Sequence, residues 1–122
     1  MRVLLLSLVF TLGGCSSLMN TSFYDDNESV AIVDVVMAVK MLDCQSPTVK
    51  DDVDHLKYKT DWMKTYSTLK GSKDIVELMD IFDKTLTGIV EKEDIKPAYC
   101  EAKKKSMIKQ TESIAEGVMR RF

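Results

Sequence analysis

Apolar residues recur at intervals of three and four positions in four successive segments of the chain. This spacing gathers them on one side of an α-helix, so it predicts four amphipathic helices. The third of these segments follows Ser72 and is closed by the sequence EKED. Its apolar positions define one inward stripe: Ile75, Leu78, Met79, Phe82, Leu86 and Ile89.

The first segment, 29–44, carries apolar side chains around most of a helix. Asp34, Lys40 and Asp43 mark its polar edge. Its many β-branched residues also suit a strand, so the periodicity favours a helix and leaves the strand as an alternative. The apolar positions are Ile32, Val33, Val36, Met37 and Val39.

Residues that begin and end helices separate the remaining segments. Ser46 and Pro47 suit an N-cap and a first turn, so the second helix is predicted to begin there. Gly71 ends that helix and Ser72 caps the next. The fourth helix is predicted to begin near Asp94 or Lys96 and to continue to Phe122. The first turn of this fourth helix contains Pro97. The inward stripe of the second helix comprises Val49, Val53, Leu56, Met63 and Tyr66. Four helices with short connections predict an all-α, up-down-up-down bundle.

An apolar run without charge precedes the helices and occupies 3–12, between Arg2 and a pair of glycines. This order is typical of a secretory signal, and the run is about half the length that a membrane-spanning helix needs. The alternative is a buried N-terminal helix or strand with a core cysteine. We therefore predict a signal peptide at 1–14, a tether at 15–28 and a helical domain at 29–122.

The residues Leu12-Gly13-Gly14-Cys15 resemble the lipobox of bacterial lipoproteins. The resemblance implies that the Cys15 thiol receives a diacylglycerol and that the chain is cut before this cysteine, whose new amino group is acylated. In that family an Asp after the cysteine marks retention in the inner membrane. Ser16 at this position implies transfer to the outer membrane, so the expected location is lipid-anchored and facing the periplasm.

The charge balance excludes one class of partner. The chain has 17 basic and 19 acidic residues, and removal of 1–14 takes away only Arg2, which leaves 16 − 19 = −3. A nucleic-acid-binding protein is expected to present a cationic surface, which this composition does not favour. The remaining 122 − 14 = 108 residues suit a single domain.

Cys44 and Cys100 are predicted to form a disulfide. Cys44 ends the first predicted helix and Cys100 lies in the first turns of the fourth, and an up-down bundle brings these two ends to the same side. The oxidising periplasm favours disulfide formation between exported thiols. Closing the loop between Cys44 and Cys100 is expected to raise the free energy of unfolding by roughly 4 kcal/mol. Two separate buried cysteines are the alternative, and a redox-active pair is disfavoured because the chain has no C-x-x-C motif.

Residues with catalytic or metal-binding chemistry are sparse. His55 is the only histidine, and Asp51 precedes it by one helical turn. Two ligands do not complete a metal site, and acids in a first turn are explained by the helix dipole. We therefore predict no catalytic residue, metal or cofactor, while a small periplasmic enzyme or metal-binding protein that uses His55 stays as an alternative. The lysines at 103–105 are interpreted as a solvated helix face, with contact to anionic lipid headgroups as the alternative.

Tyr58 and Trp62 lie four residues apart, slightly off the inward stripe, and are the best candidates for contact with a partner. Methionines at 37, 41, 63, 79 and 107 mostly fall on the predicted core stripes and are interpreted as core, with an adaptable groove for a partner as the alternative. The layout of lipobox, four helices and two cysteines at helix ends is similar to that of the pilotin lipoproteins, which escort secretins. This resemblance implies a non-enzymatic binding, scaffold or chaperone module for an envelope protein. A phage-encoded lipoprotein for superinfection exclusion or lysis control is the alternative within this class.

Overall fold

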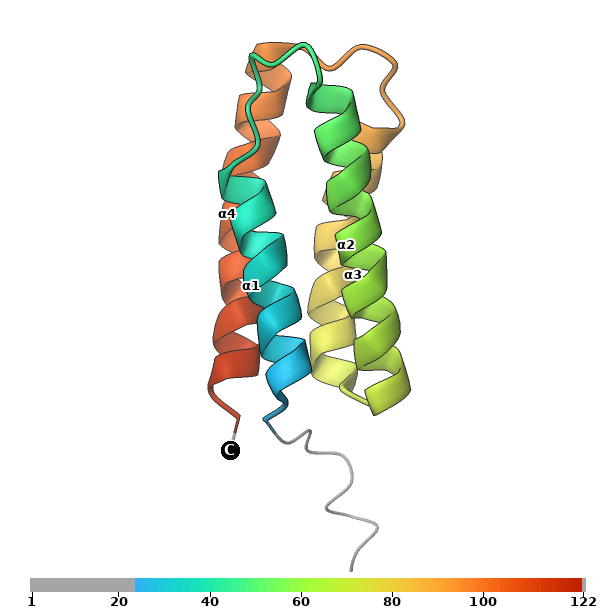
Figure 1. The fold of residues 1–122 in the computed structure, drawn as a ribbon, viewed down its shortest axis with the longest axis vertical. Helices are drawn as coiled ribbons and strands as arrows, with labels where there is room; N and C mark the ends of the chain where they lie inside the picture. The colour runs from blue at the N-terminus through green and yellow to red at the C-terminus, as the bar shows by residue number, and fades with distance from the viewer. Residues whose placement is uncertain (1–23, 122) are drawn as a thin grey trace, which may run out of the picture.

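The computed structural model describes residues 24–121, which form four helices. Each helix packs against its neighbours in chain order, and the last packs against the first (Figure 1). Successive helices run in opposite directions, so the predicted all-α up-down-up-down bundle is confirmed. The bounds are α1 Asp26–Lys40, α2 Val49–Lys70, α3 Lys73–Val90 and α4 Pro97–Met119.

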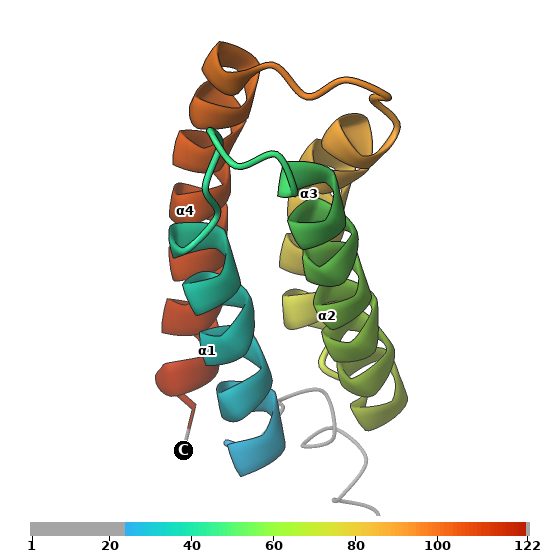
Figure 2. The same cartoon turned by 45° about the horizontal axis from the view of Figure 1, so that its top comes forward.

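The two ends of the bundle differ in what they contain. The α1–α2 and α3–α4 loops lie together at one end, which we call the disulfide end (Figures 1 and 2). The α2–α3 turn, the start of α1 and the end of α4 lie together at the other, which we call the terminal end. Residue 24 therefore enters the bundle at the end opposite to the disulfide.

α1 begins earlier than the sequence predicts. The Asp25 side chain accepts a hydrogen bond from the backbone N–H of Glu28 at 3.0 Å, which is the contact of an N-cap. The helix therefore starts three residues before Ser29, and residues 26–28 belong to the bundle rather than to the tether. It also ends four residues before Cys44, which lies in the following loop.

The other helix boundaries follow the predicted signals closely. α2 begins two residues after Pro47, and the Ser46 hydroxyl accepts the Thr48 N–H at 3.1 Å in the turn that precedes the helix. The helix ends at Gly71, whose φ of 87° lies in the left-handed region that glycine adopts without strain. Pro97 occupies the first turn of α4, as predicted.

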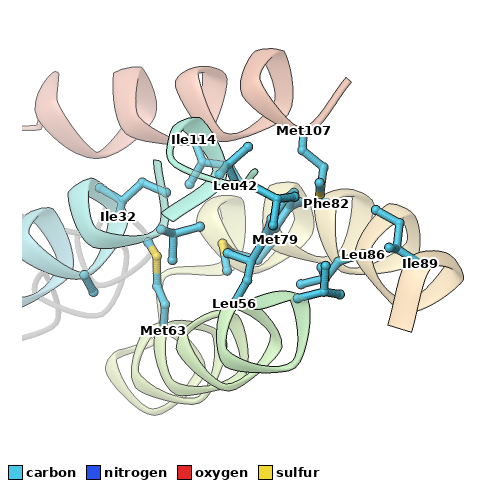
Figure 3. Close-up of a cluster of buried hydrophobic side chains, with 14 of the residues drawn as sticks. Ile32, Leu42, Leu56, Met63, Met79, Phe82, Leu86, Ile89, Met107 and Ile114 are labelled. Carbon is cyan, nitrogen blue, oxygen red and sulfur yellow. The ribbon is translucent and has the colours of Figure 1, made fainter. Parts of the chain in front are cut away.

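Side chains from all four helices meet in one apolar core (Figure 3). The predicted stripe of α3 is confirmed, because its five most central members are buried: Ile75, Met79, Phe82, Leu86 and Ile89. Met63 and Met107 are also buried, as predicted. The core interpretation is wrong for Met37 and Met41, which are exposed. α1 and its C-cap are apolar on several sides, so periodicity alone did not identify the inward side.

A disulfide joins Cys44 in the α1–α2 loop to Cys100 in the first turn of α4, with their Cα atoms 5.6 Å apart. This is the pairing that the sequence predicts. Both residues are buried, and beside them the Lys104 ammonium donates to the Leu42 carbonyl at 2.7 Å. The disulfide end is therefore held by a covalent bond and by a hydrogen bond from α4 to the loop that follows α1.

Buried charges hold the terminal end, and we call this group the Glu28 clasp. The Glu28 carboxylate is fully buried and accepts from the Ser67 hydroxyl and the Arg121 guanidinium, both at 2.9 Å. The Lys70 ammonium lies 3.5 Å away, and Arg121 also pairs with Asp74. The clasp thus connects α1, the end of α2, the start of α3 and the chain beyond α4.

Candidate functional site

Exposed apolar side chains are concentrated on two neighbouring helices, α1 and α2. Among the described residues, ten large apolar side chains are exposed, and seven of them belong to α1, its C-cap or α2. Isolated exposed apolar residues are ordinary, whereas a group of them is typical of an interaction site. We call this group the α1–α2 face, and it comprises Val30, Val33, Met37, Met41, Tyr58, Trp62 and Leu69.

α1 and its C-cap contribute the aliphatic part of the face. Val30, Val33, Met37 and Met41 follow one another at intervals of three and four residues, so they lie along one side of the helix. Their exposed fractions range from 45% to 74%. The core side of α1 is formed instead by Ile32, Val35 and Val39, so this helix has two apolar sides, and only one is covered by residues 24–121.

α2 contributes the aromatic part of the face. Tyr58 and Trp62, the predicted partner-contact pair, are 67% and 48% exposed. The structure adds a third ring, because Trp62 stacks on Tyr66 with the ring centroids 5.4 Å apart and the planes at 4°. Leu69 is 84% exposed one turn beyond, so apolar and aromatic groups follow α2 toward the terminal end.

Two shallow hollows meet at this aromatic pair. The first, of about 330 Å³, lies between the helices and is lined by Val30, Ala31 and Asp34 of α1 and by Tyr58, Lys59 and Trp62 of α2. The second, of about 400 Å³, lies on α2, with Leu69 among its lining residues. Tyr58 and Trp62 line both hollows. A ligand that occupied either hollow would therefore touch both side chains.

Hydrogen bonds hold the stacked rings in place. The Tyr66 hydroxyl donates to the Asp25 carboxylate at 2.8 Å and accepts from the Asn27 amide at 3.3 Å. The Asn27 bond lowers the pKa of Tyr66, but the bond to Asp25, burial and the negative charges of Asp25 and Glu28 together outweigh it and raise the pKa above its ordinary value. Burial raises the pKa of Asp25, but the Glu28 N–H and Tyr66 outweigh it and lower that pKa. Tyr66 is therefore a positioned platform for Trp62.

The lysines of α2 that flank the face are engaged in ion pairs with neighbouring helices. The Lys57 ammonium lies 2.8 Å from Asp83 of α3. Burial lowers the pKa of Lys57, but its hydrogen bonds to Asp61 and Asp83 outweigh burial and raise it. On the other flank, Lys59 lies 4.0 Å from Asp34 of α1. These lysines therefore join α2 to its neighbours on both sides of the aromatic pair.

The other residues singled out in the sequence lie apart from the hollows. Asp51 and His55 are exposed on α2. Within residues 24–121, no group of three or more histidine, cysteine or acidic side chains is arranged to hold a metal. The interpretation of the lysine run as a solvated face is wrong for Lys104, whose ammonium donates a hydrogen bond to the Leu42 carbonyl. The Lys103 ammonium lies over the Tyr99 ring, 5.6 Å from its centroid.

The predicted lipidation site, Cys15, and the signal segment 1–14 lie outside the described residues. Across the part of the chain that the structure describes, no helix has the length and apolar character needed to cross a membrane. Comparison of the chain with known protein families, with curated proteins and with solved structures finds no match.

Sequence reasoning missed much of the α1–α2 face. It assigned Met37 and Met41 to the core and placed Tyr66 on the inward stripe of α2, whereas Tyr66 is half-buried at the surface. One signal was present in the chain, because the spacing of Val30, Val33, Met37 and Met41 describes a second apolar stripe on α1. Two apolar stripes on one helix indicate two covered sides.

Proposed function

We propose that this chain is a non-enzymatic lipoprotein that binds another protein of the bacterial envelope through the α1–α2 face. In this proposal Cys15 carries the lipid, the bundle projects from the outer membrane into the periplasm, and Tyr58 and Trp62 contact the partner. The module acts as a scaffold or chaperone, which is the role that the layout similar to pilotin lipoproteins implies.

The observation that carries the binding role is the unequal distribution of exposed apolar groups. Seven of the ten large apolar side chains that are exposed in residues 24–121 belong to the α1–α2 face, whereas α3 and α4 contribute only Ile81 and Met119. Aromatic residues and methionine are enriched in protein interfaces. Tyr66 stacks on Trp62 and so orders its ring before a partner binds, which lowers the entropic cost of binding.

The signal pattern and the Leu12-Gly13-Gly14-Cys15 motif support the anchored part of the proposal. Acyl chains contribute about 0.8 kcal/mol for each buried methylene, so a multiply acylated terminus holds a protein on a membrane without help from its folded domain. The α1–α2 face is then available for a protein partner.

Site-specific photo-cross-linking tests the binding role. A photoreactive phenylalanine analogue is placed at Tyr58 or Trp62 in the full chain, expressed in the bacterial envelope and irradiated. We expect both positions to cross-link to the same partner. The matched control is the analogue at Ile81, an apolar residue of α3 that is 54% exposed. Equal yields from Ile81, or different products from the two test positions, would contradict the proposal.

Metabolic labelling with a fatty acid tests the anchor. The unaltered chain is expected to incorporate label and to fractionate with the outer membrane, whereas Cys15→Ser is expected to remain unlabelled and uncut. The control is the Cys44→Ala/Cys100→Ala chain, which keeps Cys15 and should still be labelled. Label in the Cys15→Ser chain, or none in the unaltered chain, would refute lipidation at this residue.

A further inference from the structure

We propose that the segment bound by the α1–α2 face is both apolar and cationic, that is, a stretch of a partner protein that combines lysine or arginine with apolar residues. This inference rests on the proposed function and specifies the chemistry of the partner. It follows from the charges that border the apolar groups of the face.

Acidic residues accompany the aromatic pair along the outward side of α2. Asp51, Asp54 and Asp61 are separated from Tyr58 by seven, four and three residues, so they share its side of the helix. All three are exposed, and the side chains of Asp54 and Asp61 are each 54% exposed. Asp61 also lines the hollow on α2 together with Trp62.

Two lysines of α2 pair with these acids, Lys57 with Asp61 at 2.7 Å and Lys50 with Asp54 at 3.9 Å, but each lysine is also shared with a neighbouring element, and both carboxylates stay half exposed. Lys50 donates to the Val90 carbonyl at the end of α3. The others pair with α3 or α1: Lys57 with Asp83, Lys64 with Asp80, Lys59 with Asp34, and Lys70 with Glu28. The outward side of α2 is therefore aromatic and acidic.

α1, on the other side of the first hollow, also carries an exposed acidic residue beside its apolar groups. Asp34 lines the hollow, and its side chain is 61% exposed even though Lys59 lies 4.0 Å away. The one lysine of α1, Lys40, pairs at 3.2 Å with Glu112 of α4. Both helices thus use their basic side chains to hold the bundle together and leave carboxylates beside the exposed apolar groups.

The carboxylates beside the face favour one of its possible occupants over the others. A cationic side chain gains from the carboxylates and also from the faces of Trp62 and Tyr58, because aromatic rings attract cations. Anionic lipid headgroups would meet like charge. A second copy that docked through the same face would bring two acidic surfaces together. An apolar and cationic polypeptide segment is therefore the occupant that complements the face in both respects.

The test uses residues 15–122 with Cys15→Ser, which contain all the core residues that are buried in the described range 24–121. Trp62 is the only tryptophan, so its fluorescence reports on the face directly. The probes are a synthetic peptide of lysine, leucine and glycine and a counterpart with glutamate in place of each lysine. We expect the lysine peptide to shift Trp62 emission to the blue in a saturable manner that added salt weakens, and the glutamate peptide to have no such effect.

Two matched variants separate the face from general attraction to a negative protein. Asp51→Asn/Asp54→Asn/Asp61→Asn is expected to weaken binding of the lysine peptide roughly tenfold, as loss of three partly exposed charges implies. The control removes three exposed acids from α3 and α4, as Glu77→Gln/Glu101→Gln/Glu116→Gln, and should change affinity less than about twofold. Circular dichroism confirms that both variants are helical.

The outcomes that overturn the inference are equal losses in the two variants, preference for the glutamate peptide, or absence of binding by the lysine peptide. A blue shift of Trp62 on anionic vesicles that the face mutations abolish would assign the face to a membrane instead. The peptide assay does not depend on the anchor or on an envelope partner. Failure of the cross-linking test with intact peptide binding would therefore refute the proposed function alone.

Discussion

Replacement of Arg121 by alanine is expected to open the Glu28 clasp and to destabilise the bundle strongly. Glu28 is fully buried, and its carboxylate depends on Arg121 for a charged hydrogen bond at 2.9 Å. The Arg121 side chain is only 8% exposed, so solvent does not replace its charge readily. Without it, Glu28 retains the Ser67 hydroxyl at 2.9 Å and the Lys70 ammonium at 3.5 Å.

The size of the effect follows from these remaining contacts. Removal of one partner of a buried ion pair typically costs about 3–5 kcal/mol, because the other charge stays buried. Lys70 still faces Glu28, so the lower end of that range, about 3 kcal/mol, is expected for Arg121→Ala. For a domain of this size, such a loss corresponds to a fall in melting temperature of roughly 12–24 °C.

Urea denaturation followed by circular dichroism and by Trp62 fluorescence measures the change in the free energy of unfolding. Arg120→Ala is the matched control, because the Arg120 side chain is 80% exposed and, among the ion pairs found in residues 24–121, pairs only with Glu116 in the last turn of α4, at 3.6 Å. Its effect should stay below about 0.5 kcal/mol. If Arg121→Ala were no more destabilising than Arg120→Ala, the clasp would not contribute to stability as described.

Three further predictions concern the disulfide, the α2–α3 turn and acid stability. Reduction of the Cys44–Cys100 bond is expected to lower the free energy of unfolding by roughly 4 kcal/mol, because the bond closes a loop over a separation of 56 residues; equal urea midpoints with and without reductant would contradict this. Gly71→Ala should lower the free energy of unfolding by about 1 kcal/mol, because φ is 87° there and an added methyl group would contact no other atoms within 4 Å. Thermal denaturation measures this loss. Partial burial raises the pKa of Asp74, but Arg121 outweighs it and holds the pKa below its ordinary 3.8. This carboxylate therefore stabilises the fold above pH 3.8 and loses that contribution as the pH falls through its folded-state pKa, so Asp74→Asn should flatten the decline of stability measured below about pH 4.

The candidate site was partly accessible from the sequence. Tyr58 and Trp62 were identified because they lie slightly off the inward stripe of their helix, and both are exposed. Tyr66 was assigned to the core because its spacing fits the stripe, and its contacts with Trp62 and Asp25 come from the packing of α2 beside the start of α1. Periodicity describes the direction of a side chain on its own helix and carries no information on the neighbour that it meets.

The amino-acid sequence alone was enough to identify the four helices and their antiparallel order, because helix periodicity, glycine and proline signals, and short connections all act over a few residues. The cysteine pair followed from that order, which brings the end of the first helix and the start of the fourth to the same side. Tertiary structure decided which side of α1 is buried, because a helix that is apolar on several sides can be rotated into the core in more than one way. It also decided that Glu28 meets Arg121, across a separation of 93 residues. Such a contact depends on the rotation and relative height of two packed helices, and these are properties of the assembled bundle rather than of either segment.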